Sequence, residues 1–339
     1  MLPKHFTLKG RVSAICAVVG IMVAAVAPAH ALAAPSAVSS ASLASGPVSY
    51  RQPDGMILST ANLYFTYHDA STASVWRTAQ SSSPGQEALL YSEPGARFGD
   101  IVFALVDNVW WGYFLAARAG VVTIRRVPLA GGPAANLTPN GIGSVDIANS
   151  HRNLITDGVN LYWQDATSVR KMPIRGGAST VLDRTSPNTP TAGLALQTGN
   201  LLYASGTSIY YVPTGGSFIT PLFRKLVTAA SRVTTLYAVS NGIYWGEDSG
   251  AVRLKVGSTI RTLPSSPGWV PTSISTNGYT AGADQIWTQC RPQSCRLQFV
   301  VTGGTWWTSI GADALGATMT TTGNVFWGDS AGVHRQIFN

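Results

Sequence analysis

The sequence predicts an all-β fold, a β-propeller of seven four-stranded blades. Three observations support this prediction. A strand-like motif recurs at a period of about 40 to 50 residues, which is the range of propeller blades. The motif is rich in aromatic residues and in Gly turns, and helical periodicity is almost absent. The last copy also lacks a fourth strand, which a segment near the N-terminus can supply.

The clearest copy of the motif is DGVNLYWQDATSVRKMPIRGGASTVL, from Asp157 to Leu182. It contains a second strand, a polar turn, a third strand, a Gly-Gly turn and a fourth strand. One stretch, residues 221–232, has apolar spacing that favours a short helix instead. The seven copies begin at Asn62, Asn108, Asn160, Asn200, Asn241, Asp284 and Asn324.

Aromatic residues in the second strands do not alternate with polar ones, as in NLYW, NVWW, GIYW and NVFW. Strands that are buried on both faces lose this alternation. Blades of a propeller are covered on both faces by their neighbours. We therefore expect the adjacent side chains of Trp110 and Trp111 to fill two different layers between blades.

The two ends of the chain predict how the ring closes. The last copy ends after its third strand, at Asn339, and the unassigned segment VSYRQ spans residues 48–52. If residues 48–52 form the outer strand of the last blade, no raw sheet edge remains. Residues 34–47 are then a flexible lead-in, and residues 48–339 are a single propeller domain.

The first 33 residues have the three parts of a secretory signal peptide. Lys4, Lys9 and Arg11 precede an apolar stretch, and Ala-x-Ala cleavage sites follow near residue 33. The apolar stretch is shorter than the roughly 20 residues that cross a bilayer. We therefore expect export to the extracellular space, the periplasm or the cell envelope, with no membrane span in the mature chain.

Two cysteines remain after residue 33, Cys290 and Cys295, and an even pair in an exported chain indicates a disulfide. Two thiols lack the further ligands that zinc needs, and the three mature histidines are not spaced as a metal motif. Arg and Lys are dispersed, which argues against a nucleic-acid partner. No motif for a cofactor is present.

The repeat resembles that of secreted bacterial propellers with YWTD-like repeats. LYWQD, from Leu161 to Asp165, and VRKMPIRGG, from Val169 to Gly177, are the nearest match, and IYWGED and VFWGD match its first half. The resemblance implies the propeller fold over the mature chain but no specific function, because propellers serve as binding proteins, lectins, hydrolases and lyases. Such domains usually have six blades, so six to eight remain possible here.

An aspartate near the end of the second strand recurs in several copies, and an arginine follows it on the third strand. A ring of ligand-binding pairs is one interpretation. A feature copied into several blades is more simply an ion pair or turn cap within each blade. The pairs are Asp69 with Arg77, Asp165 with Arg170, Asp248 with Arg253, and Asp329 with Arg335.

Departures from the repeat supply the candidate ligand-binding residues. The longest connection between blades, residues 138–152, carries Asp146, His151 and Arg152. Long irregular loops tend to be functional. Asp100 on a nearby first strand and Trp269 in the loop PSSPGWVP complete the set, and Trp306-Trp307 is a second candidate aromatic platform. None of these is assigned a catalytic role.

These features favour an exported, monomeric binding protein whose ligand is a glycan or an extracellular protein. The alternative is a carbohydrate-active enzyme, a hydrolase or lyase, that uses Asp100 or Asp146 with His151. Such an enzyme needs two converging carboxylates, or a base with a charge stabiliser. A purely structural protein of the envelope is a third possibility.

Overall fold

The computed structural model describes residues 37–44, 52–58, 61–80, 86–145, 147, 152–184, 192–216, 224–277, 284–301, 304–310, 316–319, 324–329 and 332–338. Two compact units make up the chain, Met1–Ala33 and Ala34–Asn339. The signal peptide that the sequence predicts lies outside the described residues.

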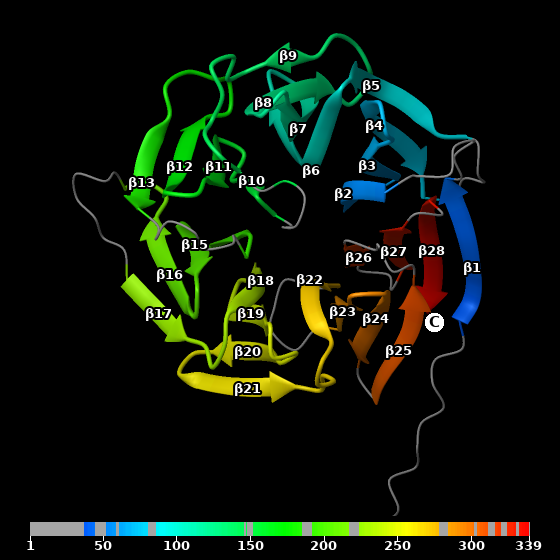
Figure 1. The fold of residues 1–339 in the computed structure, drawn as a ribbon, viewed down its shortest axis with the longest axis vertical. Helices are drawn as coiled ribbons and strands as arrows, with labels where there is room; N and C mark the ends of the chain where they lie inside the picture. The colour runs from blue at the N-terminus through cyan, green and yellow to red at the C-terminus, as the bar shows by residue number, and fades with distance from the viewer. Residues whose placement is uncertain are drawn as a thin grey trace, which may run out of the picture. The chain divides into compact units, whose positions relative to one another are not determined.

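The Ala34–Asn339 unit is a ring of seven antiparallel sheets, each of four strands (Figure 1). This confirms the predicted all-β class and the count of seven blades. In six of the sheets the strands follow one another in chain order from the centre of the ring outwards, and the seventh takes its outer strand from the N-terminus. We number the blades 1 to 7 from the N-terminus.

The first four blades contain strands β2 to β17. Blade 1 comprises β2 (Gln52–Leu58), β3 (Asn62–His68), β4 (Thr72–Ala79) and β5 (Ala88–Pro94). Blade 2 comprises β6 (Ala96–Val106), β7 (Val109–Arg118), β8 (Val121–Pro128) and β9 (Ala135–Asn136). Blade 3 comprises β10 (Leu154–Thr156), β11 (Asn160–Gln164), β12 (Ser168–Pro173) and β13 (Thr180–Arg184). Blade 4 comprises β14 (Leu194–Gln197), β15 (Asn200–Ser205), β16 (Ser208–Pro213) and β17 (Arg224–Thr228).

The last three blades complete the ring. Blade 5 comprises β18 (Val233–Val239), β19 (Gly242–Glu247), β20 (Val252–Val256) and β21 (Thr259–Leu263). Blade 6 comprises β22 (Val270–Thr276), β23 (Gln285–Arg291), β24 (Ser294–Val301) and β25 (Gly304–Ile310). Blade 7 comprises β26 (Ala317–Met319), β27 (Asn324–Asp329), β28 (Gly332–Phe338) and the N-terminal strand β1 (Ala37–Ala44).

An N-terminal strand closes the ring, as expected, but it is not the predicted one. Strand β1 pairs antiparallel with β28, from Ala37 opposite Phe338 to Ala44 opposite Val333. The prediction that residues 48–52 close the ring is therefore wrong, and residues 37–44, which were expected to belong to a flexible lead-in, are a strand. Gln52 already begins β2 of blade 1. The Ala- and Ser-rich β1 was missed because an outermost strand needs backbone hydrogen bonds on one side rather than large apolar residues.

The core lies between blades, and adjacent residues of a second strand serve opposite layers. In blade 3, Leu161 and Trp163 pack in the cluster shared with blade 2, whereas Tyr162 packs in the cluster shared with blade 4. In blade 5, Trp245 and Tyr244 divide in the same way between blades 4 and 6. The non-alternating runs therefore have the expected cause, which is burial on both faces.

Blade 2 follows this rule with Tyr113 and Phe114, three residues further along the strand than the predicted tryptophan pair. Trp110 is 55% exposed, and the buried aromatic residues of β7 are Tyr113 and Phe114. Trp110 follows a tight turn in which Asp107 and Asn108 both have positive φ, so it lies at the rim of the blade. The expectation that Trp110 fills a core layer is wrong. The helix expected at residues 221–232 is also wrong, because β17 occupies part of that stretch.

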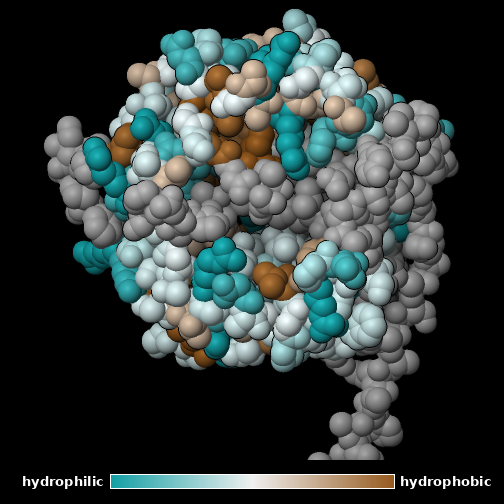
Figure 2. Space-filling view, in the orientation of Figure 1, coloured by the Kyte–Doolittle hydropathy of each residue, from teal (hydrophilic) through white to brown (hydrophobic). Residues whose placement is uncertain are grey.

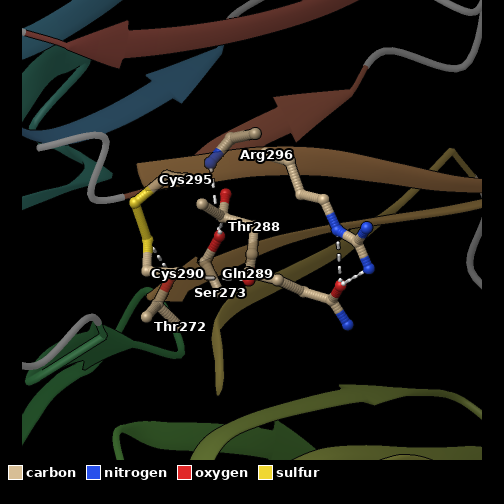
Figure 3. The surroundings of a disulfide bond; sticks show 8 residues. Thr272, Ser273, Thr288, Gln289, Cys290, Cys295 and Arg296 are labelled. Carbon is tan, nitrogen blue, oxygen red and sulfur yellow. Dashed lines mark hydrogen bonds between the residues drawn. A yellow bond between two sulfur atoms is a disulfide. The ribbon is translucent and has the colours of Figure 1, made fainter. Parts of the chain in front are cut away.

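The antiparallel order determines which connections share a face of the ring. The turns between second and third strands lie at the same end as the connections between blades, and we call this end the loop face. The predicted disulfide between Cys290 and Cys295 is confirmed, with an S–S distance of 1.97 Å. It joins β23 to β24 next to their turn on the loop face (Figure 3).

Candidate functional site

The acid–arginine pair of blade 3 has an architectural role. Arg170 donates from Nε to Asp165 Oδ2 over 2.8 Å. The other carboxylate oxygen accepts hydrogen bonds from the backbone amides of Thr167 and Ser168, at 2.8 and 2.7 Å. Asp165 thus caps the turn between β11 and β12 and fixes the arginine on β12, as the simpler interpretation of the repeat expects.

Blade 5 contains the same kind of acid–arginine pair, but its acidic residue is the one before the predicted Asp248. Arg253 donates to Glu247 Oε1 over 2.8 Å, and the indole of Trp245 donates to the same oxygen over 3.0 Å. Glu247 is completely buried. The predicted partner, Asp248, instead accepts from Arg232 over 3.3 Å. Asp248 lies at the exposed turn, where it cannot reach the inward face of β20.

Blade 1 does not show the predicted pair, and in blade 7 the pair stays a prediction. Asp69 accepts from the backbone amides of Ser71 and Thr72, at 2.7 and 2.8 Å, and so caps its turn. Arg77 donates instead to the backbone carbonyl of Leu129. In blade 7, Arg335 donates to the backbone carbonyl of Gln80, and the side chain of Asp329 lies outside the description.

Two of the predicted ligand-binding residues meet at the centre of the ring. The backbone N–H of Arg152 donates to Asp100 Oδ2. Asp100 lies at a bulge of β6 between Phe98 and Ile101. Arg152 has a φ of 61° and its guanidinium lies 4.5 Å from the ring centroid of Tyr237 on β18. Asp146 and His151 lie outside the described residues, so their roles stay predictions.

The hydrogen bond between Asp100 and Arg152 belongs to a series that ties neighbouring blades together. Thr66 Oγ1 of blade 1 donates to the Gly99 carbonyl of blade 2 over 2.8 Å. Thr234 Oγ1 of blade 5 donates to the Pro271 carbonyl of blade 6 over 2.6 Å. Asp100 thus has an architectural task between blades 2 and 3, independent of any ligand.

Trp269 lies in a different environment, on the loop face of blade 6. Its connection links β21 to β22, and its side chain is half-buried rather than an open platform. The guanidinium carbons of Arg291 and Arg296 each lie 4.4 Å from its ring centroid. Arg291 also donates from Nε to the Gly268 carbonyl over 3.2 Å.

The disulfide holds the hairpin that presents these arginines. Cys290 and Cys295 face each other across β23 and β24, and Gln289 and Arg296 form the next cross-strand pair. Arg296 donates from Nε and Nη2 to Gln289 Oε1, at 3.1 and 2.9 Å (Figure 3). Side chains two apart on a strand share a face, so Arg291 lies on the same face as Gln289.

The row continues outwards to Trp307 on β25. The guanidinium carbon of Arg296 lies 5.5 Å from the Trp307 ring centroid, and Trp307 is 62% exposed. Aromatic rings and guanidinium groups therefore alternate from the loop face to the outer strand. We call Trp269, Arg291, Arg296 and Trp307 the blade-6 cluster. The side chain of Trp306 lies outside the description.

The cluster is strongly cationic. Burial lowers the pKa of Arg296, and the neighbouring positive charge of Arg291 lowers it further. A guanidinium nevertheless stays protonated in proteins. Cation–π contacts with Trp269 offset part of the cost of placing two like charges together, and an anion would offset more.

A pocket of about 540 Å³ lies between blades 2 and 3. Residues 137–144 of the long connection line it, together with Trp163, Asp165 and Arg170. Its two charged side chains are already paired with each other. Figure 2 shows hydrophobic residues in the upper half of the ring, in the region of β7, β8 and β11 of Figure 1.

Two further searches give negative results within the part of the chain that the structure describes. No group of three or more His, Cys, Asp or Glu side chains is placed to hold a metal ion. No helix there has the length and apolar composition needed to cross a membrane.

Sequence reasoning found Trp269 but missed the arginines beside it. The signal was present in CRPQSCR, where an arginine lies next to each cysteine of a constrained hairpin. A second signal was Trp287-x-Gln289, where three other blades have Trp-x-Asp or Trp-x-Glu. The sequence alone does not show that these arginines lie beside Trp269, because that depends on the register of β23 with β24.

No family model and no curated protein match the chain. Solved structures match it in fold alone. It is 13% identical to PorZ of Porphyromonas gingivalis, described as an essential bacterial surface component of the type-IX secretion system, with a TM-score of 0.56. That match covers 88% of this chain and 39% of the other, so the chain spans about two fifths of PorZ.

Two other solved structures are similar in the same way. YCF48 from Cyanidioschyzon merolae is 10% identical, with a TM-score of 0.59, and the match covers 88% of this chain and 99% of the other. The extracellular domain of BT4673, a putative one-component system of B. thetaiotaomicron, is 10% identical, with a TM-score of 0.57 and coverage of 90% and 40%. At these identities the likeness defines the class, a seven-bladed β-propeller, and leaves function to the site.

Proposed function

We propose that this chain is an exported binding propeller that holds an extracellular glycan at the blade-6 cluster. The observation that carries the proposal is the row of alternating indole and guanidinium groups on the loop face. Glycan sites combine aromatic rings, which pack on the apolar face of a sugar, with a few polar groups that orient its hydroxyls. The exposed ring of Trp307 and the free guanidinium donors supply both.

Export is supported by the tripartite sequence of residues 1–33 and by the disulfide, which forms in oxidising compartments. Among similar folds, PorZ is described as a surface component and the BT4673 domain as extracellular. We propose the extracellular space or the cell envelope as the location. We further propose that the unit acts as a monomer, since the ring closes on itself.

We do not propose catalysis. The carbohydrate-active alternative depended on Asp100 or Asp146 together with His151. The carboxylate of Asp100 already accepts a backbone hydrogen bond at the tie between blades 2 and 3. No observation brings a second carboxylate or a histidine toward it within the described residues.

A glycan array with the Ala34–Asn339 unit tests the proposal. We expect reproducible binding that falls about tenfold or more in Trp307→Ala, since truncation of a central aromatic anchor typically costs 1.4 kcal/mol or more. Trp110→Ala is the matched control, because it removes a similarly exposed indole from the rim of blade 2. Equal loss in both variants, or silence across the array with capture of a protein instead, would contradict glycan binding at blade 6.

A further inference from the structure

We infer that the glycan bound at the blade-6 cluster is acidic, and that Arg291 and Arg296 together bind its carboxylate or sulfate group. The inference rests on the proposed glycan-binding function and deepens it by assigning the charge of the ligand. Its basis is a substitution within the repeat, which removes a counter-charge from blade 6 alone among the three blades compared.

The residue two positions after the buried tryptophan of the second strand accepts a hydrogen bond from an arginine of the third strand. It is Asp165 in blade 3, paired with Arg170 at 2.8 Å. It is Glu247 in blade 5, paired with Arg253 at 2.8 Å. In blade 6 the tryptophan is Trp287 and the acceptor is Gln289, a neutral amide.

In blade 6 the arginine still bonds to the residue two positions after the tryptophan, but that residue carries no negative charge. Gln289 is completely buried, and a single amide oxygen accepts two hydrogen bonds from Arg296. Among the described residues, no carboxylate lies within 4.0 Å of Arg291 or Arg296. The acidic residues of the adjacent blade-5 turn, Glu247 and Asp248, are each paired with an arginine of their own.

A surplus of hydrogen-bond donors accompanies the missing charge. Of the donors of Arg291, only Nε is used within the described residues, and Arg291 is exposed. Nη1 of Arg296 makes no hydrogen bond there and is not sealed from solvent. One buried donor on the same strand face, Gln289 Nε2, also lacks an acceptor in the described structure. A carboxylate at this position, such as Glu247 in blade 5, has no such donor and accepts from Trp245 as well as from Arg253.

The missing component is therefore an oxyanion. Guanidinium groups bind carboxylate and sulfate groups through paired charge-assisted hydrogen bonds. Both guanidiniums contact the ring of Trp269, they lie on diagonal positions of the same hairpin face, and the charge of Arg291 is felt at Arg296, so both act on an anion bound at this end of the hairpin. The exposed indole of Trp307 lies on the outer side of Arg296 and can pack against the next sugar ring. An acidic peptide fits less well, because the cationic groups are concentrated at one point.

Gln289→Glu is the decisive variant, since it returns to blade 6 the carboxylate that blade 5 has. Two matched polysaccharide pairs serve as probes, polygalacturonate with its methyl ester and dextran sulfate with dextran. Binding to immobilised Ala34–Asn339 is measured for the wild type, Gln289→Glu and Arg291→Gln. Arg224→Gln, which removes an exposed arginine from the outer strand of blade 4, is the control for net charge.

We expect the wild type to bind polygalacturonate, dextran sulfate or both. It should bind the neutral counterparts of these polymers at least tenfold more weakly. Gln289→Glu and Arg291→Gln should each weaken the acidic interaction about tenfold or more, whereas Arg224→Gln should change it less than twofold. Gln289→Glu should also raise the melting temperature, which shows that the lost binding does not come from misfolding. Which acidic probe binds identifies carboxylate or sulfate as the bound group.

Three outcomes would overturn the inference. Equal binding of a charged polymer and its neutral counterpart would leave the proposed glycan binding in place and exclude the anion. Acidic binding that is unchanged in Gln289→Glu would show that blade 6 does not hold the charge. Binding of polyglutamate, but of no polysaccharide, with the same loss in Gln289→Glu would show that the partner is an acidic peptide and would contradict the proposed function as well.

Discussion

Glu247 and Gln289 occupy matching positions in neighbouring blades, two residues after a buried tryptophan. Each accepts a hydrogen bond from an arginine of the third strand. A carboxylate there compensates the guanidinium, whereas an amide leaves the positive charge for a ligand. The side chain at this one position, carboxylate or amide, thus distinguishes the structural role of blade 5 from the candidate binding role of blade 6.

Removal of the charge at Glu247 tests this difference in blade 5. We expect Glu247→Gln to destabilise the unit by about 3 kcal/mol, because it leaves the partly buried Arg253 without its counter-ion. Urea denaturation followed by tryptophan fluorescence measures the effect. Asp248→Asn, which breaks the half-exposed pair with Arg232 in the same turn, should cost less than about 1 kcal/mol. Similar losses in the two variants would contradict the architectural role assigned to Glu247.

Single residues were also where sequence reasoning was least complete. It paired Asp165 with Arg170 correctly, whereas its assignment of Trp269, Asp100 and Arg152 to a ligand site stays a prediction. It mispaired Arg253 with Asp248, because consecutive residues of a strand point to opposite faces and the sequence does not say where the turn begins. Arg291 and Arg296 became candidate site residues only from the cross-strand register, which places them beside Trp269.

At the scale of an element, turn caps determine where each strand ends. Asp157 accepts hydrogen bonds from the backbone amides of Val159 and Asn160, and its second oxygen accepts from the Tyr162 hydroxyl over 2.6 Å. Burial raises the pKa of Asp157, but these hydrogen bonds outweigh burial and hold the pKa below its ordinary value. The carboxylate form therefore stabilises the turn between β10 and β11.

The pH dependence of stability tests this cap. A carboxyl group with a lowered pKa contributes stability above its unfolded pKa of about 4, and the contribution is lost as the pH falls through the folded value. Asp157→Asn should cost about 1–2 kcal/mol at pH 7. The difference from the wild type should shrink as the pH falls below about 4. Thermal denaturation between pH 2 and pH 7 gives both curves, and a constant difference would contradict the assignment.

Elements were predicted well where side chains carry the signal. The repeat was recognised from the aromatic second strands and their turns, because burial on both faces of a strand requires apolar residues at consecutive positions. Strands β1 and β17 were misread for the opposite reason. The outer strands of a blade are held mainly by backbone hydrogen bonds, which leave little trace in composition.

At the scale of the Ala34–Asn339 ring, one strand from the N-terminus joins the blade formed by the C-terminus. Six residue pairs connect β1 to β28. The same principle of closure was predicted from the sequence, since a ring with a missing outer strand has a raw edge. Only the identity of the closing segment was wrong.

Deletion of residues 37–44 tests closure. We expect a loss of about 3–6 kcal/mol, from roughly six ladder hydrogen bonds at about 0.5–1 kcal/mol each. The exposed edge of β28 should also promote self-association, which light scattering detects. Replacement of the segment by a Gly-Ser stretch of equal length controls for the loss of chain. A deletion variant as stable and monomeric as the parent would contradict the role of β1.

The ring also separates two kinds of residue at its loop face. Asp100 and Arg152 connect blades near the centre, whereas the blade-6 cluster lies towards the outer strand and retains unused donors. The sequence suggested a single site built from both groups. The described contacts of Trp269 involve blade 6 and its own connection, so the two groups are separate in the structure.

The most direct test is a crystal structure of the Ala34–Asn339 unit with a short oligogalacturonide. We expect a carboxylate of the ligand in hydrogen-bond contact with the Nη groups of Arg291 and with Nη1 of Arg296, and a sugar ring packed on Trp307. Ligand density beside Arg152 at the centre of the ring, or in the pocket between blades 2 and 3, with blade 6 empty, would contradict the assignment of an acidic-glycan site to blade 6.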